Sequence, residues 1–129
     1  MKFYENNPYV KYLGMKLENI ACGSINIAMK IDAKTHSNVY HAAHGGALMS
    51  LADTAMGAAC LSVNKKVVTL EMNINCIKSV PEDQVIYANG KVLHNGMHVV
   101  IAECEITGKN GDLYAKARGS FYVLNKFTE

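Results

Sequence analysis

The segment that most constrains the fold of this chain covers residues 45–61 and carries apolar side chains around most of its circumference. It is rich in Ala, Leu and Met, which are good helix formers. A helix that is apolar on nearly all sides is stable only where the rest of the protein covers it. The sequence therefore predicts a long central helix that other elements enclose.

The enclosing elements are predicted to be strands, because apolar and polar residues alternate in several of the other segments. Between residues 24 and 32, the side chains that share the apolar face are Ile25, Ile27, Met29 and Ile31. Further strands are predicted over residues 68–78, 85–93, 99–107 and 113–124.

Two Asn-Gly pairs, Asn95-Gly96 and Asn110-Gly111, separate the last three predicted strands. Asn-Gly is the favoured two-residue turn of β-hairpins, so these strands are expected to be mostly antiparallel. A short helix over residues 7–13 and a loop over residues 35–43 complete the expected elements. An antiparallel β-sheet wrapped around one long central helix is an α+β arrangement.

The length of 129 residues and a hydrophobic content of 50% predict one folded domain over residues 1–129. The net charge is +2, and no basic run is longer than Lys65-Lys66, which argues against a nucleic-acid groove. No segment has the ~20 apolar residues of a membrane span, and residues 1–12 lack the apolar core of a signal peptide. We therefore expect a cytoplasmic protein with no nucleic-acid or membrane partner.

The four cysteines, Cys22, Cys60, Cys76 and Cys104, each lie in an apolar segment, and none forms a Cys-x-x-Cys pair. A free cysteine behaves as a small buried hydrophobe. All four are therefore interpreted as packing residues rather than as a disulfide framework.

The central helix carries a stripe of small and polar residues, because Ser50, Asp53, Thr54 and Gly57 recur at helical spacing. Gly46 precedes Asp53 by two turns and falls on nearly the same face. A carboxylate in an enclosed helix is costly unless it is paired or hydrated. Asp53 is therefore either a structural residue bonded to a backbone group or a lysine, or a functional carboxylate.

The predicted start of this helix reads His44-Gly45-Gly46. The first amides of a helix lack internal partners and carry the positive end of its dipole. Glycine has no Cβ, so a carbonyl oxygen can approach those amides closely, as in an oxyanion hole. The alternative is that the glycines only permit a tight turn or close packing.

Gly45 and Asp53 lie eight residues apart, which is about 12 Å along a helix axis. One carbonyl group cannot contact both within a single chain. Either the two groups are unrelated, or a two-fold dimer brings Asp53 of one chain to Gly45 of the other. Oligomer formation would also help a chain this short to bury enough surface.

The histidines do not predict a metal site. His41 and His44 form a His-x-x-His pair, but no carboxylate or cysteine lies at a helpful spacing. His44 is expected to orient its loop or to contact a ligand. His94 and His98 flank the Asn95-Gly96 turn and are expected at the surface.

The motif HGGALMSLADTAMG, from His44 to Gly57, resembles the signature of the phenylacetic-acid-degradation (PaaI-like) thioesterases, which have the hotdog fold. The resemblance covers nearly the whole chain, including residues 12–15, 69–73 and 115–124. It implies an acyl-CoA thioesterase that converts an aryl- or medium-chain acyl-CoA to the free acid and CoA. It also implies a homodimer that assembles to a homotetramer, with no metal and no cofactor other than the CoA of the substrate.

The resemblance also implies roles for single residues. The Gly45 amide would polarise the thioester carbonyl, and Asp53 of the partner subunit would act as general base or nucleophile. Asn38 and Thr69 occupy the positions that help to hold the carbonyl and the water in relatives. The residues expected to contact the substrate are His44, Gly46, His94, Asn95 and Gly96.

Two other functions are compatible with these residues. A hotdog hydratase or dehydratase acting on an enoyl thioester would pair a histidine such as His44 with an acidic residue such as Asp53, although the Pro-containing loop signature of dehydratases is absent. A non-catalytic acyl-CoA-binding hotdog protein would bind the thioester without releasing free thiol.

Overall fold

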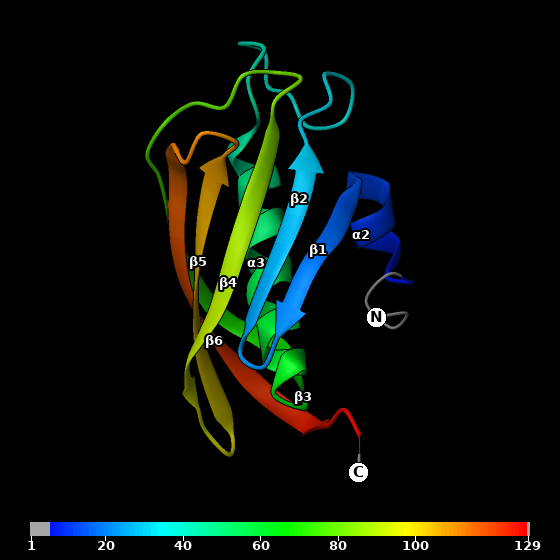
Figure 1. Cartoon of the computed structure of the whole chain (residues 1–129), viewed down its shortest axis with the longest axis vertical. Coiled ribbons are helices and arrows are strands. Elements are labelled where there is room, and N and C mark those ends of the chain that lie inside the picture. The colour runs from blue at the N-terminus through cyan, green and yellow to red at the C-terminus, as the bar shows by residue number, and fades with distance from the viewer. Residues whose placement is uncertain (1–5, 129) are drawn as a thin grey trace.

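The computed structural model describes residues 6–128, which form one six-stranded sheet, one long helix and one short helix (Figure 1). The elements in chain order are α2 (Pro8–Leu13), β1 (Met15–Ala21), β2 (Ser24–Lys30), α3 (Gly45–Ser62), β3 (Lys65–Cys76), β4 (Val85–Asn95), β5 (Val99–Gly108) and β6 (Leu113–Lys126).

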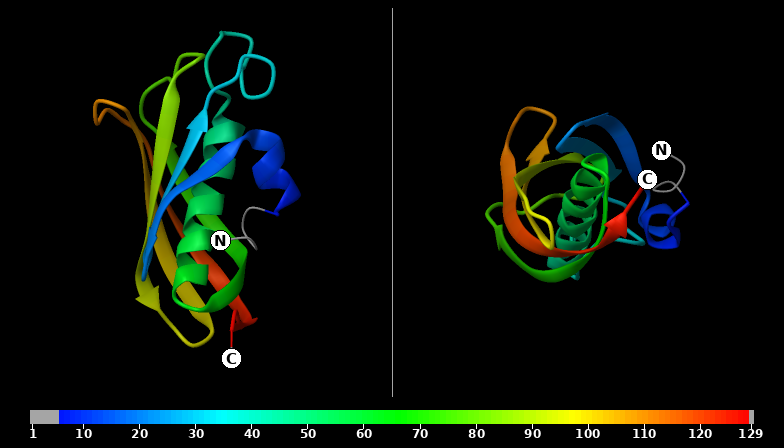
Figure 2. Two further views of the ribbon diagram at one scale, coloured as in Figure 1. Left: turned by 45° about the vertical axis from the view of Figure 1, so that its right-hand side comes forward. Right: turned by 90° about the horizontal axis from the view of Figure 1, so that it is seen from below.

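The strands lie in the order β1-β2-β4-β5-β6-β3, and every neighbouring pair is antiparallel. Seen end-on, the sheet curves around α3, and α2 lies on the side that the sheet leaves open (Figure 2). This is the predicted α+β arrangement, and the hotdog fold that the resemblance implied is confirmed.

The predicted central helix is confirmed, but its enclosure by the sheet is incomplete. Most of its apolar side chains are buried against the strands, Leu51, Ala55 and Met56 completely. β4 approaches so closely that a Cβ atom at Gly90 would lie 2.7 Å from the Ala55 carbonyl oxygen. One stripe of α3 is not buried by the sheet, and it comprises the exposed or half-buried residues Gly46, Met49, Ser50, Asp53, Thr54 and Gly57.

The alternation rule identified the buried strand β2 correctly, because Ile25, Ile27, Met29 and Ile31 are all buried. It missed β1 entirely. β1 is an edge strand in which only Met15 is buried, so its sequence lacks the two-residue period that a half-buried strand shows.

The two Asn-Gly hairpins are confirmed as hairpins, but the predicted two-residue turns are wrong. Asn95 is the last residue of β4 and Gly96 has no positive φ, so the turn lies over residues 96–98. At the second hairpin, the Gly111 amide donates to the Gly108 carbonyl at 3.0 Å and only Gly111 has a positive φ, of 86°. The loop is therefore a four-residue connection, residues 109–112, whose third residue is a left-handed glycine.

The expectation that all four cysteines are buried is correct for Cys60 and Cys104 and wrong for Cys22 and Cys76. Cys22 lies in the turn between β1 and β2, and Cys76 ends the edge strand β3, so solvent reaches both. All four are free thiols. Burial raises the pKa of Cys60 and of Cys104 to about 12.

Neither helix in the described range 6–128 is long and apolar enough to cross a membrane.

Candidate active site

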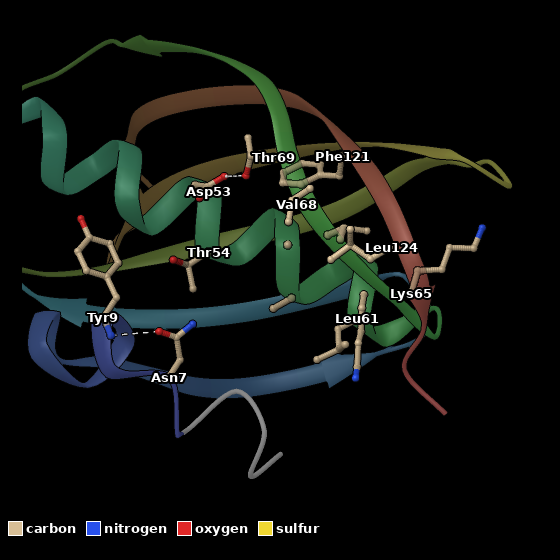
Figure 3. A pocket seen from close by; sticks show the side chains of 14 residues that line it. Asn7, Tyr9, Asp53, Thr54, Leu61, Lys65, Val68, Thr69, Phe121 and Leu124 are labelled. Carbon is tan, nitrogen blue, oxygen red and sulfur yellow. Dashed lines mark hydrogen bonds between the residues drawn. The ribbon is translucent and has the colours of Figure 1, made fainter. Parts of the chain in front are cut away.

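Asp53 projects from the open stripe of α3 toward β3, where it meets Thr69 (Figure 3). The Thr69 hydroxyl donates to Asp53 Oδ1 at 2.6 Å, so it orients the carboxylate. Within the described chain, Asp53 Oδ2 accepts no hydrogen bond. This oxygen is therefore available to accept a proton or to attack a substrate.

A cavity of about 380 Å³ adjoins this pair. Its walls come from four elements that are distant in sequence: the start of α2, the second half of α3, the first half of β3, and β6. The lining residues are Asn7, Tyr9, Asp53, Thr54, Gly57, Ala58, Leu61, Lys65, Lys66, Val67, Val68, Thr69, Phe121 and Leu124.

The helix α2 is held against α3 by one hydrogen bond at this cavity. The Ser50 hydroxyl donates to the Gly46 carbonyl at 2.9 Å, so its proton is already used. The Tyr9 hydroxyl, 2.7 Å from Ser50 Oγ, is therefore the donor in the second bond. The Tyr9 side chain in this way closes the α2 side of the cavity (Figure 3).

A second hollow lies at the N-terminal end of α3, lined by residues 37–40 together with His44 and Gly45. Here Asn38 Oδ1 accepts from the amides of Tyr40, at 2.8 Å, and Ala42, at 3.2 Å. Because both partners are N–H donors, they fix which side-chain atom is the oxygen. Asn38 Nδ2 is left as a donor with no acceptor among the described residues.

The amides at the start of α3 differ in their partners. His44 is the N-cap, and its Nδ1 accepts from the Gly46 amide at 3.0 Å. The amides of Ala47 and Leu48 both donate to the His44 carbonyl. Only the Gly45 amide donates to no acceptor in the described range, so it is the group free to bind a carbonyl oxygen.

The local backbone does not require a glycine at position 45. Its φ is not positive, and a Cβ atom placed there would meet no atom within 4 Å. At Gly46, by contrast, a Cβ atom would lie 3.3 Å from the His44 ring nitrogen that caps the helix. The glycine at position 46 thus leaves room for the His44 ring that caps the helix. The Gly46 amide is already bonded to His44, so the predicted contact of Gly46 with substrate cannot use it.

The structure brings Thr69 to Asp53 and brings Asn38 and His44 to Gly45, but it does not bring these two groups together. No residue lines both hollows. About 12 Å of helix separates Gly45 from Asp53, so the two groups lie in separate hollows of the chain. His44 and Asp53 accordingly form no pair within the chain.

The other predicted substrate contacts lie apart from both hollows. His94 and Asn95 are exposed at the end of β4, and the Gly96 carbonyl accepts a hydrogen bond from Lys65 Nζ. His41 faces Glu82 at 3.5 Å, a partner that its sequence spacing did not suggest. Among the described residues, no cluster of three or more His, Cys, Asp or Glu side chains could hold a metal ion.

Several residues near the site were missed by sequence reasoning. Tyr9, Phe121 and Leu124 line the Asp53 cavity although they are far from Asp53 in the chain, and no local pattern marks them. His36 is buried next to the loop that lines the second hollow. It accepts from the Asp32 amide, so its other ring nitrogen donates to the Leu13 carbonyl, each at 2.8 Å.

The sequence profile of the thioesterase superfamily matches residues 40–115. The acyl-coenzyme A thioesterase PaaI of Escherichia coli is 29% identical over 121 residues, which are 94% of this chain and 86% of that protein. The 1,4-dihydroxy-2-naphthoyl-CoA hydrolase of the same organism is 30% identical over 118 residues, 89% of this chain and 85% of its own length.

Solved structures of related proteins also match this chain over most of its length. The E. coli PaaI protein superposes with a TM-score of 0.91 and 27% identity, covering 97% of this chain and 90% of that one. A hypothetical thioesterase of Streptococcus pneumoniae, solved with coenzyme A, has a TM-score of 0.83 and 28% identity, covering 87% and 90%.

Proposed function

This chain belongs to the thioesterase superfamily, as a PaaI-like hotdog thioester hydrolase, and we propose that it hydrolyses acyl-CoA at a site shared by two subunits. Asp53 and Thr69 of one subunit face Gly45 and Asn38 of the other. Two equal sites then form across a two-fold axis, and each is complete only in the dimer.

In this site the thioester carbonyl oxygen accepts hydrogen bonds from the Gly45 amide and from Asn38 Nδ2. Both donors stabilise the negative charge that develops on this oxygen in the tetrahedral intermediate. Asp53 Oδ2 takes a proton from water as the water oxygen attacks the carbonyl carbon. The C–S bond then breaks, and the CoA sulfur leaves with a proton, which yields the free acid and CoA.

Asp53 can also act as a nucleophile. Attack by Oδ2 on the carbonyl carbon would expel CoA and leave a mixed anhydride, which water then hydrolyses. The hydrogen bond from Thr69 to Oδ1 orients the carboxylate in either route. Incorporation of ¹⁸O from labelled water into Asp53 during turnover would identify Asp53 as the nucleophile, because label enters the side chain when water attacks the Asp53 carboxyl carbon of the anhydride.

The observation that carries the proposal is the unpaired Gly45 amide. The three amides that follow it, those of Gly46, Ala47 and Leu48, all have acceptors at His44. A backbone donor without an acceptor at the positive end of an 18-residue helix favours an anionic oxygen.

The shared site is also supported by what the single chain leaves exposed near its half-sites. Val39 and Tyr40 beside Gly45, and Met49 and Val68 near Asp53, are large apolar residues that are about half or more exposed. The Ser37 hydroxyl is buried in the second hollow with no hydrogen-bond partner in the described chain, which is costly unless another molecule supplies one. We propose a homodimer that assembles further to a homotetramer.

The acyl group is proposed to be aryl or medium-chain, and the CoA is proposed to lie toward His94, Asn95 and Gly96. The relatives named for PaaI and for 1,4-dihydroxy-2-naphthoyl-CoA hydrolysis, and the neighbour solved with coenzyme A, support a CoA ester. Independence from metals and added cofactors and a cytoplasmic location stay predictions from sequence.

The test is the Asp53→Asn variant, assayed by thiol release from a panel of acyl-CoAs. This change keeps the shape of the side chain and removes its basicity, so kcat should fall at least about a hundredfold. The matched control is Asp112→Asn, which neutralises an exposed carboxylate outside both hollows and should keep normal turnover.

Near-normal turnover by folded Asp53→Asn would overturn the assignment of Asp53. Hydration of an enoyl-CoA without thiol release would favour the hydratase instead. Tight binding of acyl-CoA with no thiol release would favour a non-catalytic binding protein.

A further inference from the structure

Beyond the start of α3, the glycines that face this helix or lie within it fall into two groups. Gly90 and Gly119 are required by packing, since a Cβ atom there would lie 2.7 Å from the Ala55 carbonyl oxygen and 3.0 Å from the Phe121 ring, respectively. Gly57 is different, because a Cβ atom there would meet nothing within 4 Å and its φ is not positive. Neither packing nor backbone conformation explains a glycine at this position.

A glycine in the interior of a helix lowers stability by roughly 0.5–1 kcal/mol relative to alanine. Gly57 lies in the middle of α3, one turn after Asp53, and it lines the cavity of about 380 Å³. The chain therefore keeps a space open beside Asp53 at some cost in helix stability.

The cavity continues from Gly57 away from Asp53, where apolar side chains line it together with Lys65 and Lys66. Ala58 and Leu61 follow on α3, while Val68 on β3 and Phe121 and Leu124 on β6 form the facing wall (Figure 3). From Asp53 to Leu61 the helix rises about 12 Å, with Gly57 near the midpoint. An extended chain attached to a carbonyl at Asp53 would pass over Gly57 on its way to Leu61.

Three polar side chains along this path, those of Thr54, Tyr9 and Lys65, already have partners. The Thr54 hydroxyl donates to the Ser50 carbonyl at 2.7 Å, and the Tyr9 hydroxyl donates to Ser50 Oγ. Lys65 Nζ donates to the Gly96 carbonyl, and Gly96 does not line the cavity. The path thus suits an occupant without polar substituents.

We propose that this cavity receives the acyl group and that Gly57 determines how long an acyl chain the enzyme accepts. The inference rests on the proposed function, in which the carbonyl carbon lies at Asp53. It assigns the substrate class to unsubstituted medium-chain acyl groups, because a short acyl group ends before Gly57 and a longer one needs the space that Gly57 leaves.

The test is a graded series, Gly57→Ala and Gly57→Leu, assayed with butanoyl-, hexanoyl-, octanoyl- and decanoyl-CoA. The ratio of kcat/KM for decanoyl-CoA to that for butanoyl-CoA should fall slightly in Gly57→Ala and at least about tenfold in Gly57→Leu. Each methylene that can no longer be buried in the cavity should lower kcat/KM about fourfold (~0.8 kcal/mol).

Two controls accompany the series. Glu18→Leu adds the same side chain at an exposed position of β1 outside the cavity and should leave the ratio unchanged. Gly57→Ala should unfold at a higher temperature than the natural protein, because alanine favours the helix and meets no neighbour. A change in its acyl preference then cannot come from poor folding.

An unchanged ratio in Gly57→Leu would overturn the inference. An equal fall in kcat/KM for all four substrates would overturn it as well. Such a result would mean that the cavity holds a part common to the substrates, such as the pantetheine arm. Failure of the proposed function looks different, because it would appear as normal turnover in Asp53→Asn or as no thiol release from any acyl-CoA by the natural protein.

Discussion

At the scale of single residues, the two buried cysteines show how burial changes the chemistry of a side chain. Cys60 on α3 and Cys104 on β5 are both fully buried, and desolvation raises the pKa of each thiol to about 12. The ordinary value is 9.0, so the folded protein holds these two protons at pH values where the unfolded chain releases them.

This difference predicts a loss of stability at alkaline pH. The stabilisation is complete below about pH 9 and is lost as the pH rises from about 9 toward 12, because the unfolded state then binds fewer protons. Urea unfolding between about pH 8 and pH 10 should show the decline, and it should be smaller in the double variant Cys60→Ala/Cys104→Ala. The exposed pair provides the control, since Cys22→Ala/Cys76→Ala should keep the full decline; an equal decline in both double variants would contradict the assignment.

At the scale of elements, α3 depends on an unusual N-cap. His44 holds the Gly46 amide through Nδ1, a role that Ser, Thr, Asp or Asn usually fills. This contact leaves the Gly45 amide as the free donor, so the cap links the stability of the helix to the geometry of the proposed site.

Replacement of His44 separates these two effects. His44→Ala removes the acceptor and should lower the free energy of unfolding by about 1 kcal/mol, whereas His44→Asn supplies a good N-cap and should largely restore it. Chemical denaturation measures the stability and thiol release measures the activity. If His44 acts only through the cap, Asn restores both; restored stability without restored activity would instead assign His44 a contact with substrate.

At the scale of the whole molecule, one chain carries both parts of the proposed site, but about 12 Å of the rigid helix α3 separates Gly45 from Asp53. The exposed apolar residues near both half-sites and the unpartnered Ser37 hydroxyl favour completion by a second chain. Activity should therefore depend on subunit contact.

Mixed subunits test this directly. Asn38→Asp keeps the oxygen that holds the Tyr40 and Ala42 amides but loses the donor Nδ2, so it damages one half-site, while Asp53→Asn damages the other. Each homodimer should be nearly inactive. Random exchange makes half of the dimers mixed, and each mixed dimer has one intact site, so activity should recover to about a quarter of normal.

No recovery above the two parent activities would contradict the shared site, provided that subunit exchange is verified with differently tagged chains. A strict monomer in sedimentation, with full activity, would contradict it as well.

The secondary structure was largely predictable, because helix and strand periods are local. The continuous apolar segment predicted α3, and the alternation of Ile25, Ile27, Met29 and Ile31 predicted β2. β1 was not predictable in this way, since an edge strand with one fully buried residue carries no period. The turn types failed for a related reason, because strand length and bulges, rather than the Asn-Gly pair alone, determine the hairpin loops.

The residues of the candidate site were predictable only where they share one short segment. His44, Gly45 and Asp53 lie within ten residues. Helix geometry alone therefore placed Asp53 about two turns from Gly45. Helix geometry also placed Asp53 and Gly57 on one stripe.

What the sequence determined by itself is therefore the set of elements and the spacing along α3, since both follow from interactions between residues a few positions apart. Only the tertiary structure decided which amide at the helix start is free, that Thr69 reaches Asp53, and that Tyr9, Phe121 and Leu124 close a cavity around Gly57. These outcomes depend on how the sheet curves around the helix, a property that arises from contacts between residues far apart in the chain.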